Sequence, residues 1–205
     1  LQGKIALVTG GDSGIGRSVA VLYAKEGADV AIGYFDEQED AEAVVEQLTS
    51  LGVNAKAYAH DLKSVDASQN LIDKVVKDFG GLNILVNKGG VQFPQDNFED
   101  VSPEQIKETL ETNVFGMMFL SQAAAPHLTD GDAIINTTSV TAYRGSAHLI
   151  DYSATKGAIV AFTRSLASSL IDQGVRVNAV APGPIYTPLI PATFSEDKVE
   201  NQGGD

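Results

Sequence analysis

The sequence predicts an α/β protein in which a doubly wound parallel sheet carries helices on both faces. Short apolar runs alternate with helical stretches of ten or more residues, which is typical of parallel strands joined by right-handed crossovers. No linker, low-complexity segment or short-period repeat interrupts this alternation, so residues 1–205 are expected to form a single domain. A glycine-rich turn after the first strand makes the predicted sheet Rossmann-like.

Six apolar runs with the length of strands can be found, and most are bounded by glycine or polar residues. They cover residues 4–9, 28–34, 54–59, 82–87, 133–138 and 175–180. Helical spacing of apolar residues predicts helices between them, at residues 15–26, 38–51, 66–79, 103–127 and 151–171. The longer irregular stretches all follow strand ends, at the edge where open parallel sheets bind ligands.

Composition excludes several classes of function. The formal net charge is −13, which argues against nucleic acid and anionic membranes as partners because such binding needs clustered Lys and Arg. No apolar run reaches the ~20 residues of a membrane span, and the first residues lack the layout of a signal peptide. There is no cysteine, hence no disulfide, thiolate chemistry or Cys-based metal site. These features predict a soluble cytoplasmic protein that binds no metal.

Tyr152 and Lys156 are the first candidates for chemistry. Four residues apart, they project from one face of a helix, and a neighbouring ammonium favours the phenolate form of a tyrosine. Lowering the tyrosine pKa from ~10 to ~7 would require about 4 kcal/mol. The spacing alone is unspecific, because a surface tyrosine packed on a lysine stem has the same pattern.

Gly10, Gly14 and Gly16 are the candidates for nucleotide binding. Between a strand and a helix, glycines permit a tight turn and close approach of the backbone to a pyrophosphate, which the helix N-terminus stabilises. An ordinary glycine-rich connection remains the alternative. A P-loop is disfavoured because no Gly-Lys-Ser/Thr follows.

Taken together, the motifs resemble the short-chain dehydrogenase/reductase family over residues 1 to about 191. The likeness rests on the order and spacing of Thr9-Gly10-x-x-x-Gly14-x-Gly16, Asn87, Asn113, Ser139, Tyr152-x-x-x-Lys156 and Pro182-Gly183. The resemblance implies reversible hydride transfer between a nicotinamide and a small alcohol or carbonyl substrate. It also implies a homo-oligomer, either a dimer or a tetramer.

Four catalytic roles follow from the resemblance. Tyr152 would exchange a proton with the substrate oxygen, and Ser139 would hydrogen-bond the same oxygen. Lys156 would bind the ribose of the nicotinamide and depress the Tyr152 pKa, while Asn113 would hold a water of the proton relay. Without the resemblance, the sequence gives little reason to assign Asn113 a catalytic role, because a single Asn on a helix is usually exposed or bonded to its own backbone.

The resemblance also implies a set of cofactor contacts, to which Tyr152 and Lys156 belong. Gly10, Ser13, Gly14, Ile15 and Gly16 would line the pyrophosphate, Asp61 and Leu62 the adenine, Asn87 the adenosine ribose, and Pro182, Gly183, Ile185 and Thr187 the nicotinamide. Asp61 has an alternative role as an acid at a helix N-terminus. Tyr34 occupies the family's usual acidic position, yet Asp12, Asp36 and Glu37 lie near it, so NAD is expected, with NADP as the alternative.

The sequence departs from the family in two places. Lys88 stands where the family usually has the second asparagine after the fourth strand. Family members usually continue through another helix and strand, so the C-terminal part is expected to be incomplete, with the sixth strand exposed at the sheet edge. Both departures leave open a non-catalytic protein that senses dinucleotides, although the complete set of catalytic residues argues against it.

The sequence does not define the substrate. Its pocket is expected from residues 91–94, 141–150 and 186–189, which mix aromatic, apolar and amide groups. Arg144 is a lone candidate for binding a phosphorylated substrate.

Overall fold

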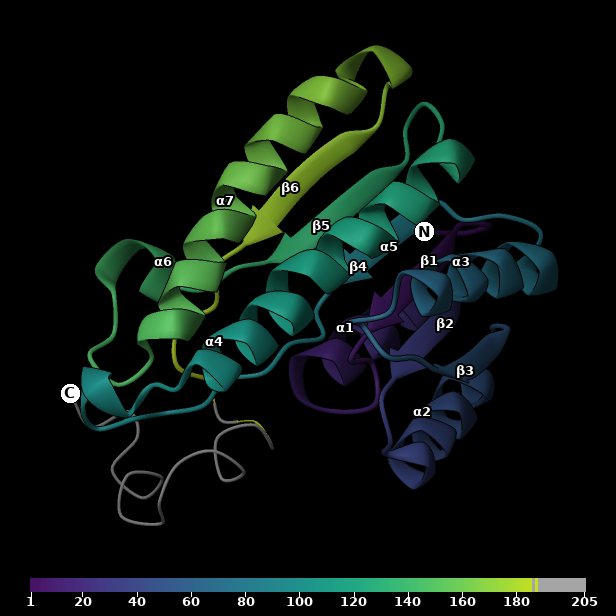
Figure 1. The fold of residues 1–205 in the computed structure, drawn as a ribbon. Helices are drawn as coiled ribbons and strands as arrows, with labels where there is room; N and C mark the ends of the chain where they lie inside the picture. Colours follow the sequence, from purple (N-terminus) through teal and green to yellow (C-terminus); the bar gives the residue numbers. More distant parts are fainter. Residues whose placement is uncertain (186, 188–205) are drawn as a thin grey trace.

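The six expected strands form one parallel sheet in the order β3-β2-β1-β4-β5-β6 in a computed structural model (Figure 1). The structure describes residues 1–185 and Thr187. The strands are β1 (Ile5–Thr9), β2 (Asp29–Tyr34), β3 (Ala55–Ala59), β4 (Ile84–Asn87), β5 (Ala133–Thr137) and β6 (Arg176–Val180). Each lies within its predicted range. β1 pairs with both β2 and β4, so the strand order reverses at β1.

Helices cover both faces of the sheet, as expected for a doubly wound fold. The α-helices are α1 (Gly14–Lys25), α2 (Gln38–Ser50), α3 (Val65–Phe79), α4 (Pro103–Leu110), α5 (Gly116–Ala124), α6 (Thr141–Arg144) and α7 (Ile150–Leu170). Side chains of α1 and α2 form one buried cluster with the sheet, and side chains of α3, α5 and α7 form another on the opposite face. The chain therefore buries two cores, one on each face.

Local sequence signals explain where several helices begin and end. Ser64 caps α3 by accepting a hydrogen bond from the Ala67 amide, and Ser102 caps α4 in the same way, with Pro103 in the first turn. Gly80 ends α3 in the left-handed conformation. Such capping depends on near neighbours in the chain, which is why these boundaries could be read from the sequence.

The stretch 103–127 is helical throughout, as predicted, but it is not a single regular α-helix. A π-helical turn, η2 (Glu111–Phe115), separates α4 from α5, and a 3-10 turn, η3 (Ala125–His127), ends the stretch. A π turn holds one more residue than an α turn and rotates the side chains that follow it. Asn113 lies in this turn and is 1% exposed, so the expectation of an exposed or back-bonded asparagine is wrong.

β6 forms an edge of the sheet among the described residues, and Val180 on it is half exposed. This agrees with the expected exposure of the sixth strand. The expected incompleteness of the C-terminal part concerns residues outside those described. No helix within the described ranges is long and apolar enough to cross a membrane.

Candidate active site

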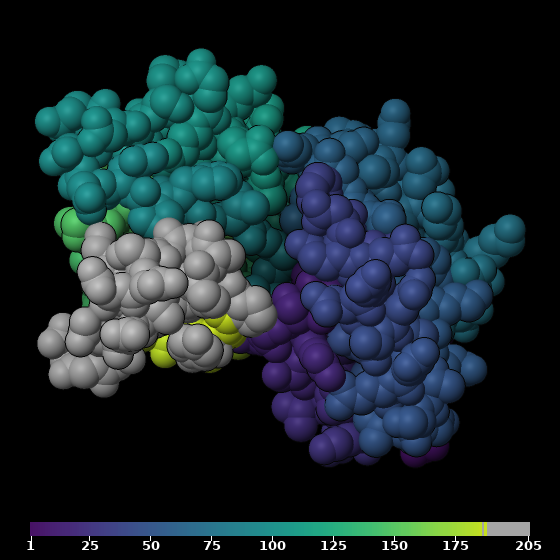
Figure 2. Space-filling view, turned by 90° about the horizontal axis from the view of Figure 1, so that it is seen from below, coloured from purple at the N-terminus to yellow at the C-terminus, as the bar shows by residue number. Residues whose placement is uncertain are grey.

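A cavity of about 390 Å³ opens at the carboxyl ends of the strands, where the strand order reverses. Seen from that side, the molecule is hollowed between the purple and blue N-terminal residues and the teal residues of the middle of the chain (Figure 2). The predicted site residues that line the cavity are Gly10, Ser13, Gly14, Ile15, Tyr34, Asp61, Leu62 and Thr187. Such crevices are where open α/β sheets bind ligands.

The glycine-rich turn has a shape that only glycines allow. Gly10 and Gly14 have φ of +61° and +52°, in the left-handed region. A side chain on Gly16 would collide with the carbonyl of Gly10, so Gly16 lets α1 start directly behind the turn. Gly16 itself is not among the residues that line the cavity, so this close packing is the role that the structure gives it, and its expected contact with the pyrophosphate stays a prediction.

The N-terminus of α1 lies at the cavity, which Ser13, Gly14 and Ile15 line, and the first amides of a helix have no partner within the helix. Ser13 is the N-cap but makes no side-chain hydrogen bond to the helix, and no acidic residue lies in the first turn. Uncapped amides and the helix dipole together favour a phosphate group. The glycine cradle and this helix end therefore fit the diphosphate of a dinucleotide.

Asn87 does not face the cavity, which corrects the expectation that it meets the adenosine ribose. Its Nδ2 donates to Ser121 Oγ at 3.1 Å and to Asn136 Oδ1 at 2.9 Å, and the residue is buried. Asn136 in turn donates to Thr163 Oγ1 at 3.0 Å. Asn87 thus links β4 to β5 and α5, because its position in the strand directs the side chain toward the helices rather than the crevice.

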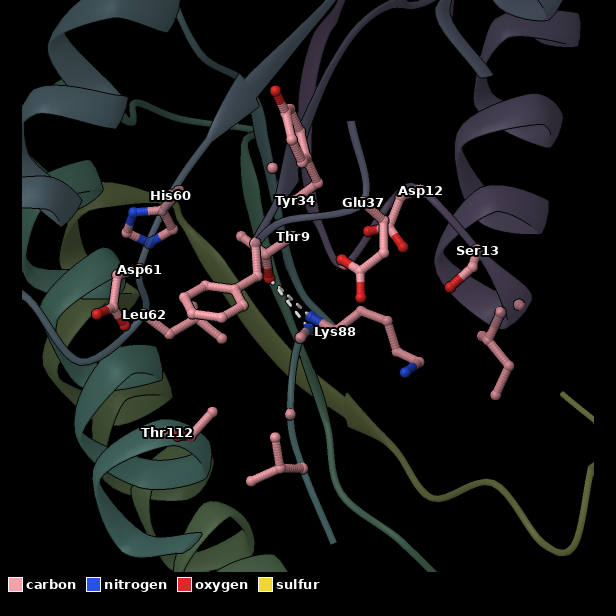
Figure 3. Close-up of a pocket in the computed structure, with 18 of the residues that line it drawn as sticks. Thr9, Asp12, Ser13, Tyr34, Glu37, His60, Asp61, Leu62, Lys88 and Thr112 are labelled. Atoms are coloured by element: carbon pink, nitrogen blue, oxygen red, sulfur yellow. Dashed lines mark hydrogen bonds between the residues drawn. The ribbon is translucent and has the colours of Figure 1, made fainter. Parts of the chain in front are cut away.

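At the other end of the cavity, Asp61 lies in a turn before α3. Its Oδ1 accepts a hydrogen bond from the Lys63 amide at 2.9 Å, while Ser64 is the N-cap of α3. The alternative role of Asp61 as a helix-capping acid is therefore not seen. Asp61 and Leu62 line the cavity together with Tyr34 at the end of β2 (Figure 3).

The predicted catalytic residues come together beside this cavity. Lys156 Nζ lies 5.2 Å from the centre of the Tyr152 ring and donates to the Thr137 carbonyl at 2.9 Å. The Ser139 side chain hydrogen-bonds Tyr152. One turn of helix α7 and the segment after β5 therefore place three side chains in a single group. Tyr152 and Lys156 share a helix face as their spacing predicts, and Ser139 joins them as the resemblance implies.

Asn113 joins the group through the π turn. Its Oδ1 accepts from the Val91 amide at 2.8 Å, and its Nδ2 donates to the Val91 carbonyl at 2.8 Å and to Thr155 Oγ1 at 3.2 Å. A Cβ on Gly90 would lie 2.9 Å from Asn113 Oδ1 and 3.9 Å from Lys156 Nζ. Gly90 also lines the cavity, so it is the point where the cavity meets the catalytic group.

Burial changes the protonation of this group. It lowers the pKa of Lys156 to about 7, with a further contribution from Lys88, and it raises the pKa of Tyr152, which the hydrogen bond from Ser139 partly offsets. The expected depression of the Tyr152 pKa by Lys156 is therefore not found in the protein alone. The reason is that desolvation acts on both groups and weakens the charge of the lysine.

Comparison with known proteins places this geometry in a family. The sequence pattern described as short chain dehydrogenase matches residues 4–198. The chain belongs to the short-chain dehydrogenase/reductase family. Its members are nicotinamide-dependent oxidoreductases, so NAD(P) is the cofactor class, in agreement with the expected NAD or NADP.

Three similar proteins illustrate the relationship. The uncharacterized oxidoreductase YhdF of Bacillus subtilis is 53% identical over 100% of this chain and 71% of its own length. The chloroplastic NADPH-dependent aldehyde reductase 1 of Arabidopsis thaliana is 46% identical over 100% of this chain and 73% of its own. A short-chain dehydrogenase from Burkholderia cenocepacia, solved in complex with NADP, is 41% identical, with a TM-score of 0.92 over 98% of this chain and 81% of that one.

Thr9 and His60 also line the cavity, although neither was among the predicted site residues. Thr9 Oγ1 accepts hydrogen bonds from the amides of Lys88 and Gly89, at 3.1 and 3.2 Å, which fixes the turn after β4 (Figure 3). His60 is 6% exposed, and neither ring nitrogen has a hydrogen-bond partner among the described residues. Burial lowers its pKa, so the ring is neutral. In the sequence, only the position of His60 at the end of the third strand could have indicated that it lines the cavity.

The expected nicotinamide contacts lie near the end of the described chain. The Pro182 carbonyl accepts from the Val140 amide at 3.1 Å, which ties this segment to the turn after β5. Ile185 is 46% exposed. Of the four residues expected to contact the nicotinamide, all of them described by the structure, Thr187 alone lines the cavity. Of the expected substrate pocket, Tyr186 and residues 188–189 fall outside the described part of the chain.

Proposed function

We propose that this oxidoreductase interconverts an alcohol and a carbonyl compound, with Tyr152 as the general acid and base. The observation that carries the proposal is the convergence of Ser139, Tyr152, Lys156 and Asn113 beside a cavity that fits a dinucleotide. A nicotinamide bound there would supply or accept the hydride. The protein itself has to position the substrate oxygen and move one proton.

Tyr152 Oη is the group that exchanges this proton. In the reduction it donates to the carbonyl oxygen, and in the oxidation it accepts from the alcohol. Ser139, which already hydrogen-bonds Tyr152, can donate to the same substrate oxygen and hold it within reach. Because burial raises the Tyr152 pKa, the tyrosine is protonated at neutral pH and is ready to act as the acid of the reduction.

Lys156 and Asn113 continue the path of the proton behind Tyr152. A lysine with a pKa of about 7 can take up or release a proton near neutral pH. Asn113 is fixed by both backbone groups of Val91, so its position does not depend on a ligand. We propose that these two residues return Tyr152 to its starting state after each turnover.

Purified protein incubated with NAD(H) and NADP(H) would test the proposal. Alcohols, sugars, steroids and aldehydes would be screened by nicotinamide absorbance, with aldehydes first because a relative is named an aldehyde reductase. Turnover of an alcohol or carbonyl, lost in the variant Tyr152→Phe, supports the proposal. Dinucleotide binding without turnover across the panel would favour the alternative, a sensor of dinucleotides.

We also propose that the chain acts as a dimer or tetramer. Ile106 on α4 and Met118 on α5 are exposed apolar side chains, and Phe115 between these helices is 44% exposed. Exposed apolar residues on neighbouring elements are typical of protein interfaces. Light scattering coupled to size exclusion should give a multiple of the chain mass, and a monomer at micromolar concentration would contradict this.

A further inference from the structure

Lys88 is the residue that distinguishes this cavity from the family pattern. It follows the last residue of β4, where the family usually has asparagine, and the hydrogen bond from its amide to Thr9 Oγ1 fixes its backbone. The side chain extends from β4 toward Ser13 and the start of α1 (Figure 3). Lys88 thus lines the same cavity as the glycine-rich turn, although its backbone follows another strand.

This ammonium is only partly compensated by the protein. Among the described residues, no carboxylate lies within salt-bridge distance of Lys88 Nζ, and no hydrogen bond from it is found. Asp12 is close enough to favour the charged form, while burial acts in the opposite direction and lowers the Lys88 pKa. A partly buried cation with spare hydrogen-bond donors is an environment that suits an anionic ligand.

The topology indicates which anionic part of a dinucleotide would meet it. β1 lies between β2 and β4, and the adenosine ribose of a bound dinucleotide is recognised at the end of the second strand. Lys88 lies on the other side of β1, toward Lys156, whose pKa it lowers. The phosphates lie between these two ends, at the N-terminus of α1. A phosphate on the 2′-oxygen of the adenosine ribose would lie on the β2 side.

We propose that Lys88 is a diphosphate-binding residue of the cofactor site, whose ammonium joins the amides of the α1 N-terminus in holding the dinucleotide. The proposal rests on the dinucleotide binding of the proposed function but not on catalysis. The usual asparagine could give a neutral hydrogen bond there, whereas lysine adds a charge. The contact should contribute equally to NAD and NADP, because both contain the diphosphate.

The test is binding of cofactor fragments to the cofactor-free protein by calorimetry. Wild type, Lys88→Met and Lys88→Asn would be titrated with ADP, adenosine and adenosine 2′-phosphate, with Lys74→Met on the exposed side of α3 as the matched control. A hydrogen bond from a charged donor predicts that the affinity for ADP falls about tenfold or more in both Lys88 variants. Adenosine and adenosine 2′-phosphate should bind as in the wild type, within about twofold.

Several outcomes would overturn the proposal. ADP affinity within about twofold of the wild type would show that the ammonium does not contact the diphosphate. An equal loss for adenosine and ADP would mean that Lys88 only shapes the cavity, and a loss confined to adenosine 2′-phosphate would place it at the ribose. Thermal unfolding of the free variants checks folding, and Lys88→Asn restores the family residue if Lys88→Met does not fold.

These outcomes are distinguishable from failure of the proposed function. A wild-type protein that binds ADP through Lys88 but turns over no alcohol or carbonyl would keep this inference and remove the enzymatic one. A wild-type protein that binds neither ADP nor a dinucleotide would remove both.

Discussion

The side-chain nitrogen of Lys156 lies 5.2 Å from the centre of the Tyr152 ring, yet its hydrogen bond goes to the carbonyl of Thr137. The two side chains are neighbours on α7 without being an ion pair, because burial raises the pKa of the tyrosine and lowers that of the lysine to about 7. Near neutral pH the protein alone therefore holds Tyr152 protonated and Lys156 partly neutral. A ligand that binds beside Tyr152 and Lys156 will therefore change the protonation of these two side chains.

Replacing Tyr152 by Phe should reduce turnover by at least ~10²-fold, because the proton donor is lost while shape and packing are kept. Dinucleotide affinity should change little. Steady-state rates with the best substrate of the screen, together with calorimetry, would measure both effects. Tyr23→Phe on α1, away from the cavity lining, is the matched control. Near-wild-type turnover of Tyr152→Phe would refute the assignment.

Lys156 should make the cofactor-free protein more stable as pH rises from about 7 to 10. In this range the folded protein has lost the Lys156 proton, since that pKa is about 7, whereas the unfolded chain keeps it up to ~10.4. The unfolded state then binds more protons, so the free energy of unfolding rises by up to ~1.4 kcal/mol per pH unit. Urea unfolding at pH 7, 8 and 9 would measure the slope. Lys156→Met should flatten the slope of the free energy of unfolding against pH, and the exposed Lys74→Met should leave it unchanged. Equal slopes for wild type and Lys156→Met would contradict the lowered pKa of Lys156.

Gly16→Ala should destabilise the protein by about 1–3 kcal/mol or prevent folding, because the new methyl group would collide with the Gly10 carbonyl. Gly157→Ala is the opposite case. Gly157 lies inside α7, and a Cβ added there would meet nothing within 4 Å, so alanine should stabilise the helix by up to ~1 kcal/mol. Thermal and urea unfolding would compare the two. A Gly16→Ala protein as stable as the wild type would show that the turn can open without cost.

NADH should bind more tightly than NADPH, by about tenfold if a single charge repulsion of ~1.4 kcal/mol separates them. Glu37 and Asp12 line the cavity, and Arg17, which could have accepted a 2′-phosphate, is bonded to Gln47 at 2.9 and 3.2 Å. Fluorescence titrations would measure both affinities, and Glu37→Gln should narrow the difference. The test is demanding because two of the similar proteins are named with NADP or NADPH. Tighter binding of NADPH would overturn the expectation.

The six strands and most helix boundaries could be predicted from the sequence because their signals are local. Buried strands of a parallel sheet read as short apolar runs, and Ser64 and Gly80 mark the two ends of α3 through hydrogen bonds to near neighbours. The relation between Tyr152 and Lys156 was predictable for the same reason, since helix geometry alone brings residues four apart onto one face.

The roles of Asn113, Asn87 and Lys88 depend on contacts between residues far apart in the chain. Asn113 is buried because the π turn directs it at Val91, and Asn87 faces Asn136 because β4 pairs with β5. No pattern of neighbouring residues in the sequence indicates the contact of Asn113 with Val91 or that of Asn87 with Asn136. The residue types of the site were therefore determined by the sequence, while their protonation and direction were decided only in the fold. The physical reason is that desolvation and long-range hydrogen bonds exist only after the strands and helices have packed.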